Sequence, residues 1–198
     1  MQRTKERLAK GETVRAAAIG RVLHHNVINM IGFNGGFDCL WLDHEHVGFS
    51  MEKLEVACMA ARSQNLDCFV RIAPTDYALV TKCLEAGAGG VMAAMVFSAK
   101  QAEEIVRWSK FAPRGFRGLN NSGFDGKYTL TPQAKFVVEA NEKSWVAIQI
   151  ETLESVESND EIHAIEGVDL LSIGPPDLTP ALGGTAALMN PKSAGAID

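Results

Sequence analysis

The sequence lacks any apolar stretch long enough to cross a membrane and any cluster of basic residues that would bind phosphate groups. No apolar run approaches the roughly 20 residues that a membrane-spanning helix needs. The net charge is −5, with acidic and basic residues interleaved, which argues against a nucleic-acid partner. The opening segment MQRTKERLAKGE is charged and lacks the apolar region of a signal peptide. We therefore expect a cytoplasmic protein that binds neither membranes nor nucleic acids.

Cysteine is scarce, and no two cysteines have the CxxC spacing of a zinc or redox motif. Cys39, Cys58, Cys68 and Cys83 each lie within an apolar strand or helix pattern. We expect reduced thiols in the core rather than disulfides or zinc ligands. Low-complexity segments and interdomain linkers are also absent. The 198 residues, 46% of them hydrophobic, therefore predict one domain with a sizeable core.

Six short apolar segments have the composition of strands that are buried on both faces, as in a parallel sheet. They are residues 16–22, 37–43, 66–73, 89–96, 145–151 and 168–174. Helical patterns lie between them: Ser50 caps one, Thr75 or Asp76 begins a second, and Ser98 begins a third. Further helices are expected near residues 132–142 and 153–165. Alternating strands and helices predict βαβ units and an α/β fold.

Polar residues gather at one end of these strands, which is where α/β proteins place their sites. The stretch Asp43-His44-Glu45-His46 ends the second strand, Arg71 lies in the third, Gln149 and Glu151 lie in the fifth, and Asp177 follows the sixth. A charge at the end of a buried strand is costly unless it is paired or binds a ligand. We therefore expect a pocket at this end of the sheet.

Glu151 and Asp177 follow neighbouring strands and supply the hard oxygen ligands that Mg²⁺ or Mn²⁺ prefers. The alternative is structural: Glu151 caps the helix near residues 153–165, and Asp177 caps a short turn. Strand alternation, if it persists, sends the two histidines, His44 and His46, to the side opposite their acidic neighbours. A His-x-His pair can chelate a metal, whereas a histidine in a loop can simply be hydrogen-bonded. The residues alone leave both interpretations open.

Six segments, taken in order, resemble the HpcH/HpaI family of class II pyruvate aldolases, within the phosphoenolpyruvate/pyruvate barrel superfamily. They are WLDHEHVGFS, FVRIAPTD, GAGGVMAAM, APRGFRG, AIQIETLESVE and EGVDLLSIGPPDLTPALG. The family is typified by 4-hydroxy-2-oxoheptanedioate aldolase. The resemblance implies a (β/α)8 TIM barrel and a metal-dependent lyase of aromatic compound catabolism. Such an enzyme forms or cleaves 4-hydroxy-2-oxo acids from pyruvate and an aldehyde.

The resemblance also implies roles for individual residues. The matching positions are the metal ligands Glu151 and Asp177, the pyruvate-binding residues Arg71, Gln149, Gly174 and Pro175, and the proton-transfer histidine His46. The metal would be Mg²⁺ or Mn²⁺, and Co²⁺ is compatible with the same ligands. Glu85 stands where the family's best-known members have an aspartate paired with the catalytic histidine. That carboxylate is one methylene longer here, which alters the geometry of the pair.

The main departure from the family is length, because a barrel of this type needs roughly 250 residues. We expect one barrel domain over residues 1–198 that lacks its seventh and eighth βα units. We favour a fragment of a longer gene product over a gap that a second subunit covers. Related family members form dimers grouped into hexamers, which implies a homo-oligomer. Two other functions stay open: a citrate-lyase-like acyl-CoA lyase, and an inactive fragment that serves as a metal-binding or assembly module.

Overall fold

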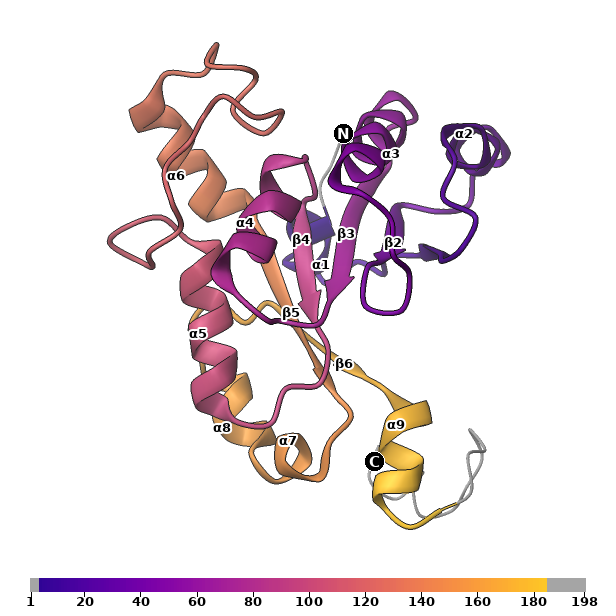
Figure 1. Ribbon diagram of the computed structural model, residues 1–198, viewed down its shortest axis with the longest axis vertical. Helices are drawn as coiled ribbons and strands as arrows, with labels where there is room; N and C mark the ends of the chain where they lie inside the picture. The colour runs from indigo at the N-terminus through magenta and orange to yellow at the C-terminus, as the bar shows by residue number, and fades with distance from the viewer. Residues whose placement is uncertain (1–3, 185–198) are drawn as a thin grey trace.

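The computed structural model describes residues 4–184, which form a six-stranded parallel sheet with the helices that connect its strands packed on one face (Figure 1). The strands are β1 (Ala16–Ile19), β2 (Cys39–Asp43), β3 (Asp67–Ile72), β4 (Gly90–Ala93), β5 (Trp145–Ile150) and β6 (Leu170–Ile173). Their spatial order is their chain order, and every neighbouring pair is parallel. Right-handed crossovers between strands in this order put the helices on one side. The sheet is therefore a half-barrel rather than a doubly wound sheet.

The helices are α1 (Thr4–Leu8), α2 (His25–Asn34), α3 (Met51–Ser63), α4 (Tyr77–Glu85), α5 (Ala99–Ser109), α6 (Gln133–Lys143), α7 (Leu153–Glu157), α8 (Asn159–His163) and α9 (Pro175–Ala181). The side chains of Ser50 and Ser98 cap α3 and α5, at the two helix starts that the sequence predicts. Of the two residues proposed to begin the helix between them, Asp76 rather than Thr75 caps α4. The segment predicted as one helix near 153–165 is two short helices that meet at Ser158. Among residues 4–184 no helix has the length and apolar character to cross a membrane.

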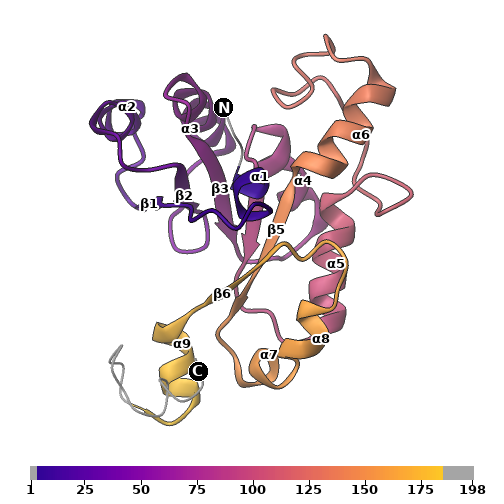
Figure 2. The ribbon, with the colours of Figure 1, turned by 180° about the vertical axis from the view of Figure 1, so that it is seen from behind.

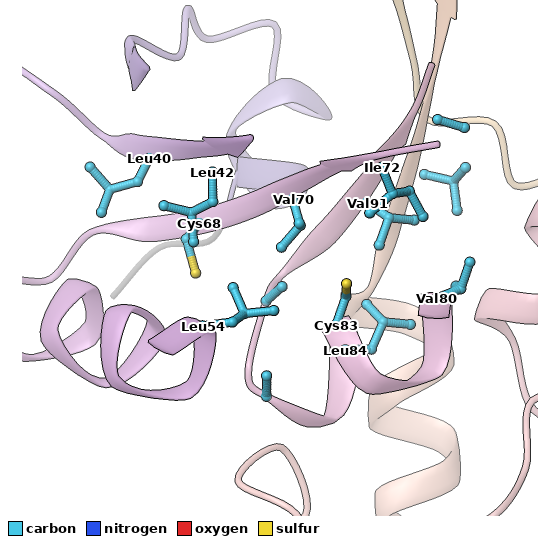
Figure 3. Close-up of a cluster of buried hydrophobic side chains, with 14 of the residues drawn as sticks. Leu40, Leu42, Leu54, Cys68, Val70, Ile72, Val80, Cys83, Leu84 and Val91 are labelled. Carbon is cyan, nitrogen blue, oxygen red and sulfur yellow. The ribbon is translucent and has the colours of Figure 1, made fainter. Parts of the chain in front are cut away.

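The main core lies between the outer face of the sheet and the helices. Alternate residues of each strand point toward the helices, such as Leu40 and Leu42 in β2. Figure 3 shows these strand side chains facing Leu54 of α3 and Leu84 of α4. All four cysteines are free and buried, which confirms the prediction of core thiols.

The remaining strand residues point to the inner face of the sheet, where they form a smaller apolar cluster. Its buried members are Cys39, Phe69, Met92, Trp145 and Ala147. The ring of Phe69 lies 5.9 Å from that of Trp41 and 5.1 Å from that of Trp145, between ring centroids. Gly90 makes room for this packing, because a Cβ there would lie 2.3 Å from Cδ2 of Trp145. The cluster occupies the inner face near the start of the strands and leaves polar side chains to the strand ends.

Helix α1 lies on the inner side of the sheet, in front of the strands in Figure 2. Three contacts hold it there: Thr4 N donates to Asp67 Oδ2 (2.9 Å), Lys5 Nζ lies 2.9 Å from Asp169 Oδ1, and Arg7 pairs with Asp38. These acidic residues precede β2, begin β3 and precede β6. Helix α1 therefore ties distant strands together at the end of the sheet where the strands begin.

Lys110 follows α5 and is a buried lysine, only 1% exposed. Its Nζ donates to Asn141 O (3.0 Å), Ser144 O (2.6 Å) and Ser144 Oγ (3.0 Å), and so joins α5 to the end of α6. Burial, reinforced by the charge of Lys5, lowers the pKa of Lys110 from its ordinary 10.5 to about 7. The amine therefore loses its proton near neutral pH in the folded chain and at much higher pH in the unfolded chain.

This difference predicts a stability that depends on pH. Between about pH 6 and pH 9 the unfolded chain retains the lysine proton while the folded chain loses it, so folding becomes more favourable as the pH rises. Relative to Lys110→Met, the wild type should gain on the order of 2 kcal/mol across that interval. Urea denaturation at several pH values measures the gain. Lys100→Met on the exposed side of α5 is the control, and equal pH slopes for wild type and Lys110→Met would contradict the prediction.

Candidate active site

Polar side chains continue the inner face of the sheet beyond the apolar cluster. They keep the two-residue spacing of the inward positions, so that Asp43 follows Trp41, Arg71 follows Phe69, and Gln149 and Glu151 follow Ala147. Asp43 is also the direct neighbour of Arg71 in the register of β2 and β3. The structure therefore brings these residues to one end of one face, where the sequence predicts a pocket.

The guanidinium of Arg71 is held in one orientation by two carboxylates. Its Nε and Nη2 donate to Oδ1 and Oδ2 of Asp43 at 3.1 and 2.8 Å, and its Nε lies 3.2 Å from Oε2 of Glu45. The ring of Trp41 lies 5.1 Å from the guanidinium carbon. Burial opposes ionisation, yet these carboxylates raise the pKa of Arg71, and the guanidinium holds the pKa of Asp43 below its ordinary range. The sequence pattern alone did not reveal this positioning role of Asp43.

Strand β2 ends at Asp43, and a turn built on that side chain places the next three residues. Oδ1 of Asp43 accepts hydrogen bonds from the backbone N–H groups of Glu45 (3.2 Å) and His46 (3.3 Å). Strand alternation therefore stops before the two histidines. His44 stacks on Phe49 at 4.7 Å between ring centroids. The side chain of His46 is 58% exposed, and its Nε2 lies 3.5 Å from Oε2 of Glu45.

Glu151 is the most enclosed carboxylate of the site, at 2% exposed. Its Oε1 accepts the backbone N–H of Met95 at 2.7 Å, and its Oε2 accepts Nε2 of Gln149 at 2.5 Å. Burial raises the pKa of Glu151 above its ordinary value, and the negative charges of Glu45 and Asp177 raise it further. Met95 has a left-handed backbone with φ of 51°. Its contribution is a backbone N–H, which the sequence pattern did not reveal.

Gly174 lies directly against this hydrogen-bonded pair. A Cβ at that position would be 2.3 Å from Oε2 of Glu151 and 2.7 Å from Nε2 of Gln149. The φ of Gly174 is −106°, so the close approach, not the backbone conformation, excludes a side chain. Pro175 begins α9, and Asp177 in its first turn is exposed. The end of β6 therefore brings Gly174, Pro175 and Asp177 to the same site.

Neither carboxylate of the expected metal pair is used as a helix cap. Thr152 caps α7 in a reciprocal arrangement with Ser155, and no side chain caps α9. The structural alternative for Glu151 and Asp177 therefore does not hold.

Glu85 is the one expected site residue that the structure does not bring to this group. It ends α4, which returns from the end of β3 to the start of β4, so Glu85 lies at the opposite end of the sheet from His46. Its Oε2 accepts Nδ2 of Asn120 at 3.3 Å, and burial raises its pKa. Within one chain the carboxylate beside His46 is Glu45, because a sheet's length separates Glu85 from the histidine.

The donor set fits a divalent cation that is shared with a substrate. Among residues 4–184, no three His, Cys, Asp or Glu side chains are grouped so as to hold a metal by themselves. Mg²⁺, however, is commonly held by one or two carboxylates, with water and substrate oxygens completing its shell. Glu151 and Asp177 would supply these two carboxylates, and the repulsion between their charges favours a cation. Oε1 of Gln149 is buried without a hydrogen-bond partner in the described part of the chain, so this oxygen acceptor is also unused beside the carboxylates.

A half-barrel of βα units with its polar cluster at the carboxyl ends of the strands has the architecture of the barrel enzymes. The chain belongs to the HpcH/HpaI aldolase/citrate lyase family, whose model matches residues 24–196. This finding confirms the resemblance seen in the sequence. Relatives in the family are named aldolases, so the chain belongs to a family of lyases.

Individual relatives show how far the similarity extends. A hydroxypyruvate/pyruvate aldolase from Pseudomonas aeruginosa is 32% identical over 198 residues, which are 100% of this chain and 73% of that protein. The crystal structure of an HpcH/HpaI aldolase from Desulfitobacterium hafniense DCB-2 matches with a TM-score of 0.90 and 29% identity, over 99% of this chain and 75% of that one. The crystal structure of the citrate synthase SbnG matches with a TM-score of 0.87 and 26% identity, over 100% and 75%.

The close approach at Gly174 predicts a specific effect of adding one methyl group. In Gly174→Ala the new Cβ must displace the side chains of Glu151 and Gln149, so Mn²⁺ binding should weaken at least about tenfold, or 1.4 kcal/mol. Gly48→Ala in the loop after β2 is the control, since a Cβ there meets no atom within 4 Å. Calorimetric titration with Mn²⁺ measures both variants, and circular dichroism checks the fold. Unchanged binding in Gly174→Ala would show that the cation is not held at Glu151.

Proposed function

We propose that the protein is a metal-dependent class II aldolase that joins pyruvate to an aldehyde or cleaves the resulting 4-hydroxy-2-oxo acid. The observation that carries the proposal is the fixed guanidinium of Arg71 near Glu151, whose carboxylate is in turn near Asp177, at the strand ends of a half-barrel. The relative from Pseudomonas aeruginosa is named a hydroxypyruvate/pyruvate aldolase, which supports this reaction class.

The reaction requires that a methyl proton leave pyruvate and that the enolate oxygen be stabilised. A divalent cation at Glu151 and Asp177, either Mg²⁺ or Mn²⁺ or alternatively Co²⁺, would supply positive charge at the substrate oxygens. A guanidinium has five N–H donors, of which Asp43 engages Nε and Nη2 of Arg71. The others remain for the carboxylate and carbonyl oxygens of pyruvate. Gln149, with Gly174 and Pro175, forms the wall beside these oxygens.

His46 is the group that we propose to transfer a proton to and from the substrate hydroxyl. Imidazole accepts and donates protons near neutral pH. Its exposure leaves the ring accessible to a substrate, and its Nε2 lies 3.5 Å from Oε2 of Glu45. Glu45 in turn contacts Arg71, so the proton-transfer group and the oxygen-binding group share one carboxylate. Glu85 has no part in this set within a single chain.

The proposed architecture is a (β/α)8 barrel of which the structure describes six strands. Within residues 4–184, β1 and β6 are the two edges of the sheet and do not pair with each other. The chain spans 73% of the length of the Pseudomonas aeruginosa relative. Two further βα units and assembly as a homo-oligomer would cover these edges. A citrate-lyase-like reaction on an acyl-CoA is the second candidate, because the family that the chain matches includes citrate lyases as well as aldolases.

Removing one charge from the metal pair should abolish metal-dependent turnover. We expect Glu151→Gln and Asp177→Asn each to lower the Mn²⁺-dependent decarboxylation of oxaloacetate at least about a hundredfold, because each keeps its size but loses an anionic ligand. Glu154→Gln on the exposed surface of α7 is the matched control. Near-normal activity of either variant at limiting Mn²⁺ would refute the ligand assignment. A wild type that binds Mn²⁺ but gives no decarboxylation would favour the inactive module.

The two histidines after β2 should differ sharply in their effect on aldol turnover. His46→Ala should lower turnover about 10²- to 10⁴-fold, because it removes the proton-transfer group. His44→Ala should cost much less, because His44 packs on Phe49. Steady-state kinetics with pyruvate and an aldehyde compare the two, and Mn²⁺ affinity should change little in either variant. If His44→Ala is the more damaged enzyme, the proposed roles are wrong.

A further inference from the structure

A cavity of about 200 Å³ lies at the opposite end of the sheet from the candidate active site. The loop from 112 to 131, helix α6, and the ends of α3 and α4 form its walls, with Arg62, Arg117, Lys127, Thr131 and Lys143 among the lining residues. Figure 1 shows α6 and this loop far from α9, which carries Asp177. The cavity is therefore separate from the site at the strand ends.

The lining of the cavity carries an excess of positive charge. Four basic residues, Arg62, Arg117, Lys127 and Lys143, face two acidic residues, Asp125 and Glu139. Asp125 pairs with Arg117 and Glu139 pairs with Lys143, each at 2.7 Å. Arg62 and Lys127 have no carboxylate partner in the described part of the chain. Two cations are therefore left without an anion.

Arg117 adds a buried positive charge to the wall of the cavity. Its side chain is only 2% exposed, and its Nε has no hydrogen-bond partner among residues 4–184. Its guanidinium carbon lies 4.6 Å from the ring centroid of Phe111, which cannot replace an oxygen acceptor. A buried donor without an acceptor loses its hydration and gains nothing in return. The positive charge of Arg117 also contributes to the lowered pKa of neighbouring Lys110.

We propose that this cavity binds a small oxyanion, whose oxygens pair with Lys127 and Arg62 beside the buried guanidinium of Arg117. Pockets for drug-sized ligands measure roughly 300 to 1,000 Å³, so a cavity of about 200 Å³ suits inorganic phosphate or a carboxylate of three or four carbons. Arg117 and Lys127 come from the long loop, whereas Arg62 belongs to α3. A bound oxyanion would therefore fasten the loop to the helical layer and stabilise the folded chain.

Calorimetric titration tests this site directly. The wild-type chain is titrated with inorganic phosphate and, separately, with malonate, at constant ionic strength and with EDTA present so that no metal recruits the anion to Glu151 and Asp177. We expect saturable binding of phosphate, of malonate or of both, and the preference identifies the source of the oxyanion. Thermal unfolding should shift upward with the ligand that binds.

Variants at Lys127 assign the binding to the cavity. Lys127 is exposed at the cavity wall, so its replacement should leave the fold intact. Lys127→Gln should weaken binding about fivefold, Lys127→Arg should retain most of it, and Lys100→Gln on α5 is the control of equal charge change. The proposal is overturned if neither anion binds saturably. It is also overturned if Lys127→Gln binds the anion as tightly as the wild type and the control Lys100→Gln do. Metal-free titration keeps this result distinct from any failure of the proposed aldolase activity.

Discussion

The two-residue alternation of side chains along parallel strands that are fixed in register decides where Asp43, Arg71 and the pair Gln149 and Glu151 lie. On β2 and β3, an inward aromatic residue is followed by an inward charged one: Trp41 by Asp43, and Phe69 by Arg71. A slip of one residue would turn Arg71 toward the helices and into the main core. The ring contacts among Trp41, Phe69 and Trp145 oppose such a slip. The apolar half of the inner face therefore positions the polar half.

Two carboxylates at the same end of the sheet have opposite electrostatic surroundings, and this difference separates their roles. Asp43 is hydrogen-bonded by a guanidinium and by two backbone N–H groups, which hold its pKa low and commit it to orienting Arg71. Glu151 is buried beside the like charges of Glu45 and Asp177, which raise its pKa. A carboxylate in that second environment is stabilised by an added cation. The charge balance thus favours the metal pair that the family resemblance implies.

The sequence predicts the features that depend on local pattern: six strands, their parallel order, three helix starts and the end of the sheet that carries the site. It misses what depends on turn geometry or on backbone groups. The side chain of Asp43 accepts the backbone N–H groups of Glu45 and His46 and so forms a turn at the end of β2. Strand alternation therefore could not predict the direction of His46. The N–H of Met95 has no residue signature. The position of Glu85 in the family motif suggested a carboxylate partner for His46. Glu85 ends α4, which leads into β4, so within one chain it lies where the strands begin, at the end opposite His46.

Stabilising contacts and site chemistry occupy opposite ends of this sheet. Where the strands begin, α1 pairs with acidic residues of distant strands, and Lys110 joins α5 to the end of α6. Where the strands end, the carboxylates of Glu45, Glu151 and Asp177 lie near one another. The chain has a glycine at position 174 because a Cβ there would collide with Glu151. Crowded like charges destabilise the folded chain when no cation is present. The two ends of a parallel sheet are built from different loops. Stabilising contacts where the strands begin can therefore offset the charge repulsion where they end, without filling the space that a substrate needs.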